Sequence, residues 1–341
     1  MDASYHYIGL DVHKRTVAYC EKRADGKTIS AGSFSTRKPA IAAWVAQRTW
    51  PWIGAMEATL FSGHLYDALA PHAVEIQVGP PARIKAISTA KHKNDAADAD
   101  TLANLLRADL FPACPMASPL VRELRRVLRY RTFLVRQAVT MKVKTTGLLM
   151  EVGAEYDARR IHGQRYFEAL LDTLDDVPAS VRDLLRTSRA ALETFQDAQK
   201  RLVNALAKHE HLRERVERLM SIDGVGVVTA LTWALEIDDP ARFSNLKKVQ
   251  SYRGLCSGQN ESAGKNKYGP LSKQRNAHLQ STLIEAAKLA PRWNAQLARV
   301  HAAALAQDKT RNRATVAVAR KLAAYLMAVD KSGQAFTIPA K

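Results

Sequence analysis

Four carboxylates within the first hundred residues have the types and spacing of a metal site. Asp11 interrupts the apolar run "YIGLDV", and Glu57 lies near the end of a second apolar run, "WIGAMEAT". Asp95 and Asp98 open a helical stretch, where a spacing of three places them on one face. Four such acids could hold two divalent ions. These ions would offset the mutual repulsion of the acids and stabilise both oxygens of an in-line phosphoryl displacement.

Each acid also has an ordinary explanation when it is taken alone. An acid in an apolar strand is costly unless it is paired, exposed or metal-bound, but Asp11 could be a strand-end acid and Glu57 a surface residue. Asp95 and Asp98 could cap a helix and favour the positive end of its dipole. Asp100 is offset from their face and is expected to be solvated. If the four acids do bind metal, their hard oxygen ligands indicate Mg²⁺ (or Mn²⁺) rather than zinc.

The elements that must position these acids alternate between strands and helices. Turn residues separate three consecutive strand-like runs, and helical and strand-like runs then follow in turn. This order predicts an α/β fold with a sheet of about five strands. An acid in the first strand, an acid ending the fourth and an acid pair opening a helix match the core of a ribonuclease-H-like metal nuclease. The expected strands are 5–12, 15–23, 27–35, 52–59 and 73–79, and the expected helices are 38–49, 62–72 and 95–109.

The composition indicates a polyanionic partner. The chain of 341 residues has a formal net charge of +18 and a pI near 9.9. Residues 1–110 contain 13 Lys and Arg against 11 Asp and Glu, a net charge of +2, so the remaining residues carry +16.

The 3 cysteines are far apart and predict neither a disulfide framework nor a zinc knuckle. With no signal peptide and no run long enough to span a bilayer, we expect a cytoplasmic protein without membrane contact.

The middle of the chain is expected to be helical. Residues 121–150 form a basic run in which a single acid, Glu123, accompanies eight cations, and residues 192–219 repeat apolar positions as a coiled-coil seam would. An ordinary solvated basic face explains the first run equally well. The candidate nucleic-acid contacts on this run are Arg122, Arg125, Arg126, Arg129, Lys142 and Lys144.

The last part begins with a possible helix-hairpin-helix element. Gly224 and Gly226 separate two helical runs, and such a turn can present backbone N–H groups to a phosphate, although a plain helix–helix turn fits nearly as well. The segment 255–279 is rich in Gly, Ser, Asn and Lys, and we expect it to be a long functional loop.

Several of these motifs together resemble a known family over nearly the whole chain. "IGLDVHK", "MEAT", "KNDAADADTLA", "SIDGVGVVTALTWALEI", the run from "SYRGLCSGQNESAGKNKYG" onward and "RATVAVARKLAAYL" occur in the order found in DEDD transposases of insertion-sequence family 110. These proteins are related to Piv invertases and act as bridge-RNA-guided recombinases. The resemblance implies a ribonuclease-H-like (RuvC-like) DEDD domain at 1–118, a helical coiled-coil linker at 119–215 and a mostly α C-terminal transposase domain at 216–341.

The resemblance also implies roles for individual residues. Asp11, Glu57, Asp95 and Asp98 match the four metal-binding acids, and Ser262 matches the serine that forms a covalent phosphoserine link to DNA. In the family, a serine of one subunit meets the acids of another within dimers and tetramers. The implied partners are donor and target DNA, a guide (bridge) RNA and further copies of the chain.

The chain departs from the family pattern around the serine. "GLCS" replaces the usual "GL-x-P" and "ESAG" replaces "SSG", so the nearby Ser257 is a rival nucleophile. Cations surround the serine and could bind the scissile phosphate, namely Lys265, Lys267, Lys273 and Arg275.

Two other functions also fit the residues. A metal-dependent junction resolvase would use the acids with water and would need no serine. A basic coiled-coil protein with a decayed core would bind RNA or DNA without catalysis.

Overall fold

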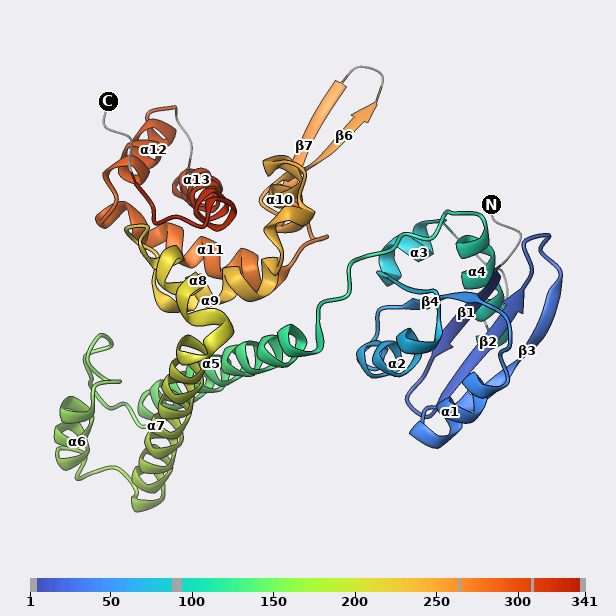
Figure 1. The fold of residues 1–341 in the computed structure, drawn as a ribbon. Coiled ribbons are helices and arrows are strands. Elements are labelled where there is room, and N and C mark those ends of the chain that lie inside the picture. The colour runs from blue at the N-terminus through green and yellow to red at the C-terminus, as the bar shows by residue number, and fades with distance from the viewer. Residues whose placement is uncertain (1–4, 88–93, 263–264, 308–309, 338–341) are drawn as a thin grey trace. The chain divides into compact units, whose positions relative to one another are not determined.

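The computed structural model describes residues 5–87, 94–262, 265–307 and 310–337. The chain divides into two compact units, Met1–Pro119 and Leu120–Lys341, and Figure 1 shows the sheet of the first and the helices of the second. The division into three domains with boundaries at 118/119 and 215/216 stays a prediction.

The first unit is built on one five-stranded sheet with the strand order β3-β2-β1-β4-β5. β1 pairs antiparallel with β2 and β2 antiparallel with β3, whereas β4 lies parallel to β1 and β5 parallel to β4. The predicted strands and helices are all present within a few residues. They are β1 (His6–Val12), β2 (Thr16–Lys22), β3 (Thr28–Ser35), α1 (Lys38–Ala46), β4 (Trp52–Glu57), α2 (Ser62–Leu69), β5 (Glu75–Gly79) and α4 (Asp95–Arg107).

Alternation along β1 sends its side chains to two different layers. Ile8, Leu10 and Val12 are buried in a core that they share with residues of α1 and α2. Tyr7 lies on the other face, in a core that it shares with residues of α4. Asp11 is an odd-numbered position of the same strand, so it belongs to the α4 face.

The sequence analysis missed one helix in this unit. α3 (Pro81–Ile87) follows β5 directly and starts with a proline at a position where a helix tolerates one. It has seven residues and buries only Ile84, which is too little for a periodic apolar pattern to be visible.

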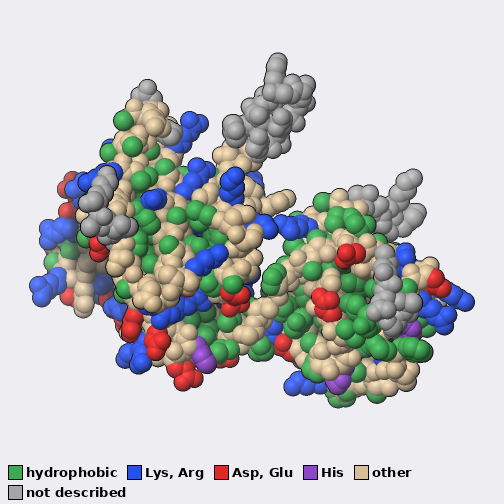
Figure 2. All heavy atoms as spheres, turned by 45° about the horizontal axis from the view of Figure 1, so that its top comes forward, with side chains coloured by type: hydrophobic (Ala, Val, Ile, Leu, Met, Phe, Trp, Pro, Cys, Tyr) green, Lys and Arg blue, Asp and Glu red, His purple; other side chains and the backbone are tan. Residues whose placement is uncertain are grey.

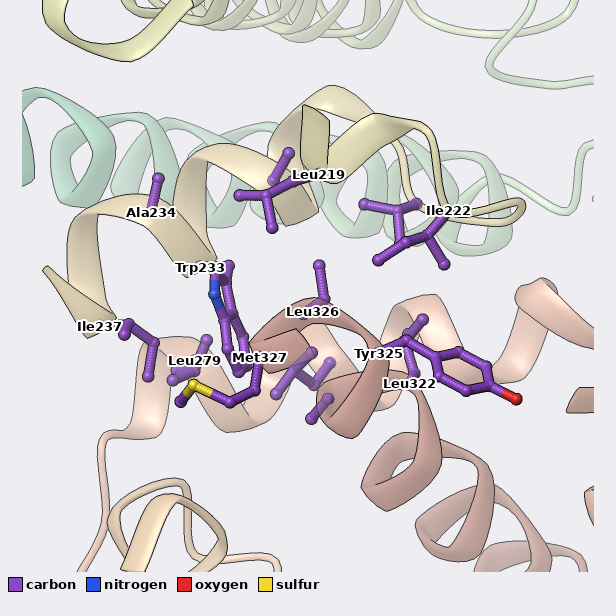
Figure 3. Close-up of a cluster of buried hydrophobic side chains, with 14 of the residues drawn as sticks. Leu219, Ile222, Trp233, Ala234, Ile237, Leu279, Leu322, Tyr325, Leu326 and Met327 are labelled. Carbon is purple, nitrogen blue, oxygen red and sulfur yellow. The ribbon is translucent and has the colours of Figure 1, made fainter. Parts of the chain in front are cut away.

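The second unit is mostly helical, with a core built around one almost entirely buried helix. α9 (Val227–Ile237) is buried from Thr229 to Ile237, and Trp233 packs among residues of three other helices, as Figure 3 shows. The other helices of this unit are α5 (Pro119–Glu151), α6 (Gln164–Asp172), α7 (Ala179–Lys208), α8 (Glu210–Met220), α10 (Leu246–Tyr252), α11 (Ala277–Leu289), α12 (Ala295–Leu305) and α13 (Arg311–Ser332), with short 3-10 turns at Pro240–Arg242 and Ala290–Arg292. A further 3-10 turn, Ala70–His72, follows α2 in the first unit.

The segment expected to be a long loop contains a β-hairpin instead. β6 (Ser257–Ser262) and β7 (Lys265–Leu271) pair antiparallel. The prediction was wrong because these strands lack the alternation of apolar and polar residues from which strands are recognised, and backbone pairing forms the ladder without it.

The predicted helical middle is confirmed, but its apolar seam is not continuous. The extended backbone of His209, with φ −65° and ψ 130°, ends α7 and starts α8, so the seam passes through two helices. α5 and α7 flank a hollow of about 460 Å³ lined by Arg131, Lys200 and Val203 among others. Pairing of these helices as a coiled coil stays a prediction.

Two further observations concern the whole of the described chain. Within 5–87, 94–262, 265–307 and 310–337, no helix has the length and apolar character needed to cross a membrane. Cys20, Cys114 and Cys256 are free thiols.

Candidate active site

Asp11 and Glu57 lie near the carboxyl ends of two adjacent parallel strands. Leu10 of β1 is in register with Met56 of β4, so the next residue of each strand is one of the two acids. Ile53 and Ala55 pack in the core on the α4 face, and Glu57 continues that alternation. The two acids are therefore neighbours on the face of the sheet that α4 covers.

Gly9 allows α4 to approach this face closely. A Cβ at Gly9 would lie 2.0 Å from the carbonyl oxygen of Ala99 and 2.5 Å from the backbone nitrogen of Ala103. Only a residue without a side chain permits the backbone of the helix to come so near to the strand. This contact places the first turn of α4 beside Asp11.

The first turn of α4 carries the acid pair. Asn94 caps the helix by accepting a hydrogen bond from the backbone N–H of Ala97 at 2.8 Å, so Asp95 and Asp98 are not needed as caps. Asp95 is 62 % exposed, whereas the Asp11 side chain is 15 % exposed. Both acids of the helix lie close enough to Asp11 to raise its pKa by repulsion.

The sequence analysis did not include His13 among the site residues, although it stands two positions after Asp11. Its Nε2 lies 3.1 Å from Asp11 Oδ2 and 3.3 Å from Asp95 Oδ1. Asp11, His13 and Asp95 each offer one metal-ligand atom, and these three atoms lie within 4.8 Å of one another. The signal in the sequence was the "DVH" spacing, because alternation returns residue i+2 to the same face of a strand.

The charged groups of this cluster shift one another's pKa values. Burial raises the pKa of Asp11 most, His13 lowers it, and Asp98 and Asp95 raise it further. In return Asp11, more than any other group, raises the pKa of His13. Carboxylate oxygens and one imidazole nitrogen are suitable ligands for a divalent ion, and a bound ion would relieve the repulsion among the acids.

Asp100 was expected to be solvated, and its side chain is partly exposed but also paired with a cation. Its side chain is 43 % exposed, and Oδ1 lies 2.7 Å from Lys22 Nζ. Asn104 donates a hydrogen bond to Oδ2 at 2.8 Å. Asp100 therefore ties α4 to β2 and takes no part in the acid cluster.

Ser262 is the last residue of β6, at the end of the hairpin of the second unit. Its backbone is paired with Lys265 across the hairpin, and the rival Ser257 lies at the other end of β6, paired with Leu271. The base of the hairpin is held by Gly254, which has φ +64° and whose carbonyl accepts a hydrogen bond from Gln280.

Comparisons with known proteins cover both units. A model of DEDD transposases of the IS110 type, described as "Transposase", matches residues 8–153, and a model described as "Transposase IS116/IS110/IS902 family" matches residues 216–302. The chain belongs to the IS110 family of transposases. It is therefore an enzyme that cuts and rejoins DNA, and the recognition made from its motifs is confirmed.

Individual transposases resemble the chain along most of its length. The "Transposase for insertion sequence element IS1111A" of Coxiella burnetii is 24% identical over 94% of this chain and 88% of its own length. The "Transposase for insertion sequence element IS1328" of Yersinia enterocolitica is 23% identical over 97% and 98%. A "Probable family 20 transposase" of Pseudomonas aeruginosa is 26% identical over 70% and 72%.

Two of the arginines expected to contact nucleic acid are engaged inside the second unit of this transposase. Arg129 donates two hydrogen bonds of 2.9 Å to the carboxylate of Glu236, which is fully buried. Arg125 donates from Nε to the carbonyl oxygen of Leu235. Both side chains hold α5 against the end of α9, and this role explains them without nucleic acid.

The remaining predicted contacts of α5 differ in exposure. Arg126 and Lys144 are exposed, whereas Arg122 and Lys142 are half-buried. On the face seen in Figure 2, Lys and Arg side chains are scattered over the second unit among acidic ones. Their role in binding stays a prediction.

The two predicted glycines of the helix-hairpin-helix turn have different structural roles. Gly224 has φ +91°, and a Cβ there would lie 2.7 Å from the Cβ of Ala290, so close packing already requires glycine. Gly226 precedes α9, which has no side-chain cap, and a Cβ there would meet open space.

The cations expected around the serine lie on β7 and just after it. Lys265 and Lys267 belong to β7, and their side chains lie outside the described part of the structure. Lys273 and Arg275 are exposed, and Arg275 packs against Gly254 and donates a hydrogen bond to the carbonyl oxygen of Ser272 at 3.0 Å.

Proposed function

We propose that this transposase cleaves and rejoins DNA through a phosphoserine intermediate on Ser262, assisted by a divalent ion bound by Asp11, Glu57, Asp95 and Asp98 in a ribonuclease-H-like core. The observation that supports the proposal is the proximity of Asp95 and Asp98 at the start of α4 to Asp11 on β1, with Glu57 at the end of the adjacent parallel strand. Such a cluster is expensive in free energy unless a cation or a catalytic task retains it.

The serine step follows from the chemistry of a hydroxyl nucleophile. The oxygen of Ser262 attacks the phosphorus, the bond to the leaving sugar oxygen breaks, and the serine proton is lost as the sugar oxygen gains one. When bound, a divalent ion would polarise the phosphate and activate an otherwise weak nucleophile. Lys273 and Arg275 are exposed beside the hairpin and could contact the negative charge that develops on the phosphate.

The choice of DNA sites is proposed to come from a guide (bridge) RNA. The excess positive charge beyond residue 110 can neutralise phosphates of RNA and DNA alike, and such contacts carry no sequence information. Assembly into dimers and tetramers, with the serine of one subunit serving the acids of another, belongs to the same proposal.

A covalent trap tests the mechanism. Protein with its co-purified RNA is incubated with Mg²⁺ and labelled element-junction DNA and then resolved on a denaturing gel. We expect an adduct with the wild type and with Ser257→Ala, and none with Ser262→Ala. Cleaved DNA without any adduct would instead support the hydrolytic resolvase, and an adduct lost only in Ser257→Ala would identify the rival serine.

A further inference from the structure

We propose that His13 is a metal ligand of this transposase, which binds a divalent ion through Nε2 together with Asp11 and Asp95 and shifts the preference of the site from Mg²⁺ towards Mn²⁺. The inference rests on the proposed metal-dependent function and extends it, because the four acids alone make an all-oxygen site.

The backbone places the imidazole where a ligand is needed. His13 follows β1 directly, and its N–H donates a hydrogen bond of 2.9 Å to the carbonyl oxygen of Thr16, which closes the turn into β2. Residue 13 is two positions beyond Asp11, so it returns to the α4 face of the sheet. The turn therefore holds His13 beside the acid cluster.

Nε2 of His13 is shared between two carboxylates from different elements. It lies 3.1 Å from Asp11 Oδ2 on β1 and 3.3 Å from Asp95 Oδ1 on α4. A single N–H cannot point well at both carboxylates. An ion held by the two carboxylates would instead accept the nitrogen lone pair of the neutral His13 imidazole. The His13 side chain is 50 % exposed, so an ion and its water ligands can reach it.

The chemistry of the donors sets the metal preference. Mg²⁺ takes oxygen ligands in a strict octahedron, keeps much of its water and gains little from an imidazole. Mn²⁺ suits carboxylate ligands as Mg²⁺ does, but it is a transition-metal ion, so we expect it to gain more than Mg²⁺ from one imidazole nitrogen. Removing His13 should therefore weaken the binding of Mn²⁺ more than that of Mg²⁺.

Pulsed electron paramagnetic resonance on the full-length protein loaded with Mn²⁺ tests the ligation directly. A coordinated imidazole couples its nitrogen to the electron spin of Mn²⁺, so we expect nitrogen modulation in the wild type. His13→Gln should lose this signal and keep a bound ion. His64→Gln, a change of an exposed histidine on α2, should retain it.

Titration of Mn²⁺ and competition with Mg²⁺ complete the test. We expect His13→Gln to weaken Mn²⁺ binding about tenfold and to change Mg²⁺ binding by about twofold or less. A loss of about tenfold is typical when a residue that supports a bound metal ion is replaced. Circular dichroism and thermal melting would verify that the variant is folded.

The possible failures can be distinguished. Mn²⁺ bound to the wild type without nitrogen coupling would overturn the role of His13 and leave the carboxylate site intact, provided that Asp11→Asn abolishes binding. A wild type that binds no Mn²⁺, or binds it unchanged in Asp11→Asn, would overturn the metal site itself.

Discussion

At the residue scale, the position of the acid pair depends on Gly9, where a single hydrogen replaces a side chain. Its neighbours in α4 are backbone atoms, which cannot rotate away as the end of a flexible side chain could. Any larger residue must push α4 away from β1, and Asp95 and Asp98 must move with the helix. Stability and metal binding are coupled at this position.

The variant Gly9→Ala tests this coupling. We expect a loss of about 1–3 kcal/mol in the free energy of unfolding, as overpacking of a close contact costs, together with weaker binding of divalent ions. Thermal melting and Mn²⁺ titration measure the two effects. Gly32→Ala is the matched control in β3, because its Cβ would make ordinary contact with the ring of Tyr19 at 3.4 Å. Equal effects at both positions would contradict the explanation.

A second residue-scale feature is the buried carboxylate of Glu236. Burial alone would raise its pKa, but the hydrogen bonds and charge of Arg129 and the hydrogen bond from Asn276 lower the pKa below its usual value of 4.5. A carboxyl group whose pKa is lowered on folding contributes stability above its unfolded pKa. That contribution is lost as the pH falls through the folded value.

Acid unfolding checks this sign. We expect the free energy of unfolding of the wild type to decline below about pH 4.5. Glu236→Gln should lower stability at pH 7 by about 1–3 kcal/mol and make the acid decline shallower, because the titrating group is gone. Glu285→Gln, which removes a largely exposed carboxylate paired with Lys288, should leave the curve unchanged. A steeper acid decline in Glu236→Gln would refute the assignment.

At the element scale, the basic residues of α5 have different surroundings on different faces of the helix. Arg125 and Arg129 donate hydrogen bonds to α9 and join two elements of the second unit, although the Arg129 side chain stays 48 % exposed. Arg126 is exposed as well. Their positions in the sequence are almost adjacent, but successive helix residues point about 100° apart, so the three side chains meet different surroundings. Basic residues on one helix need not share a role.

Two variants of α5 separate the predicted nucleic-acid contact of Arg126 from the structural role of Arg129. Arg126→Ala should weaken nucleic-acid binding, reduce its salt slope by about 0.9 log unit for one lost phosphate contact, and leave the melting temperature unchanged. Arg129→Ala should destabilise the protein by about 2 kcal/mol or more, since it leaves Glu236 buried without its cation. Fluorescence anisotropy across a salt series and thermal melting measure both. If Arg126→Ala leaves the salt slope unchanged, that side chain does not contact phosphate.

At the scale of the whole molecule, the excess positive charge and the acid cluster lie in different parts of the chain. The acid cluster belongs to the first unit, and residues beyond 110 carry a net charge of +16 against +2 for the residues before them. Phosphate neutralisation supplies most of the free energy of non-specific nucleic-acid binding, so binding and cleavage should be separable.

Asp11→Asn tests this separation. We expect DNA cleavage to fall below detection while affinity for DNA and its salt dependence stay within about twofold of the wild type, because a single neutralised acid removes no cation. Cleavage assays and anisotropy on the same preparation measure the two properties. A simultaneous loss of both, with a lowered melting temperature, would indicate that Asp11 serves folding.

The sequence by itself predicted the strands of the first unit and its helices except α3, because alternation and helical spacing are local properties of the chain. It also predicted that Asp11, Glu57, Asp95 and Asp98 belong together. It could not show the β6–β7 hairpin, whose strands are held by backbone pairing without an apolar pattern. Tertiary structure alone decided that His13 meets Asp95 and that Arg129 meets Glu236. These contacts join residues far apart in sequence, and their partners are set by how closely helices and strands pack.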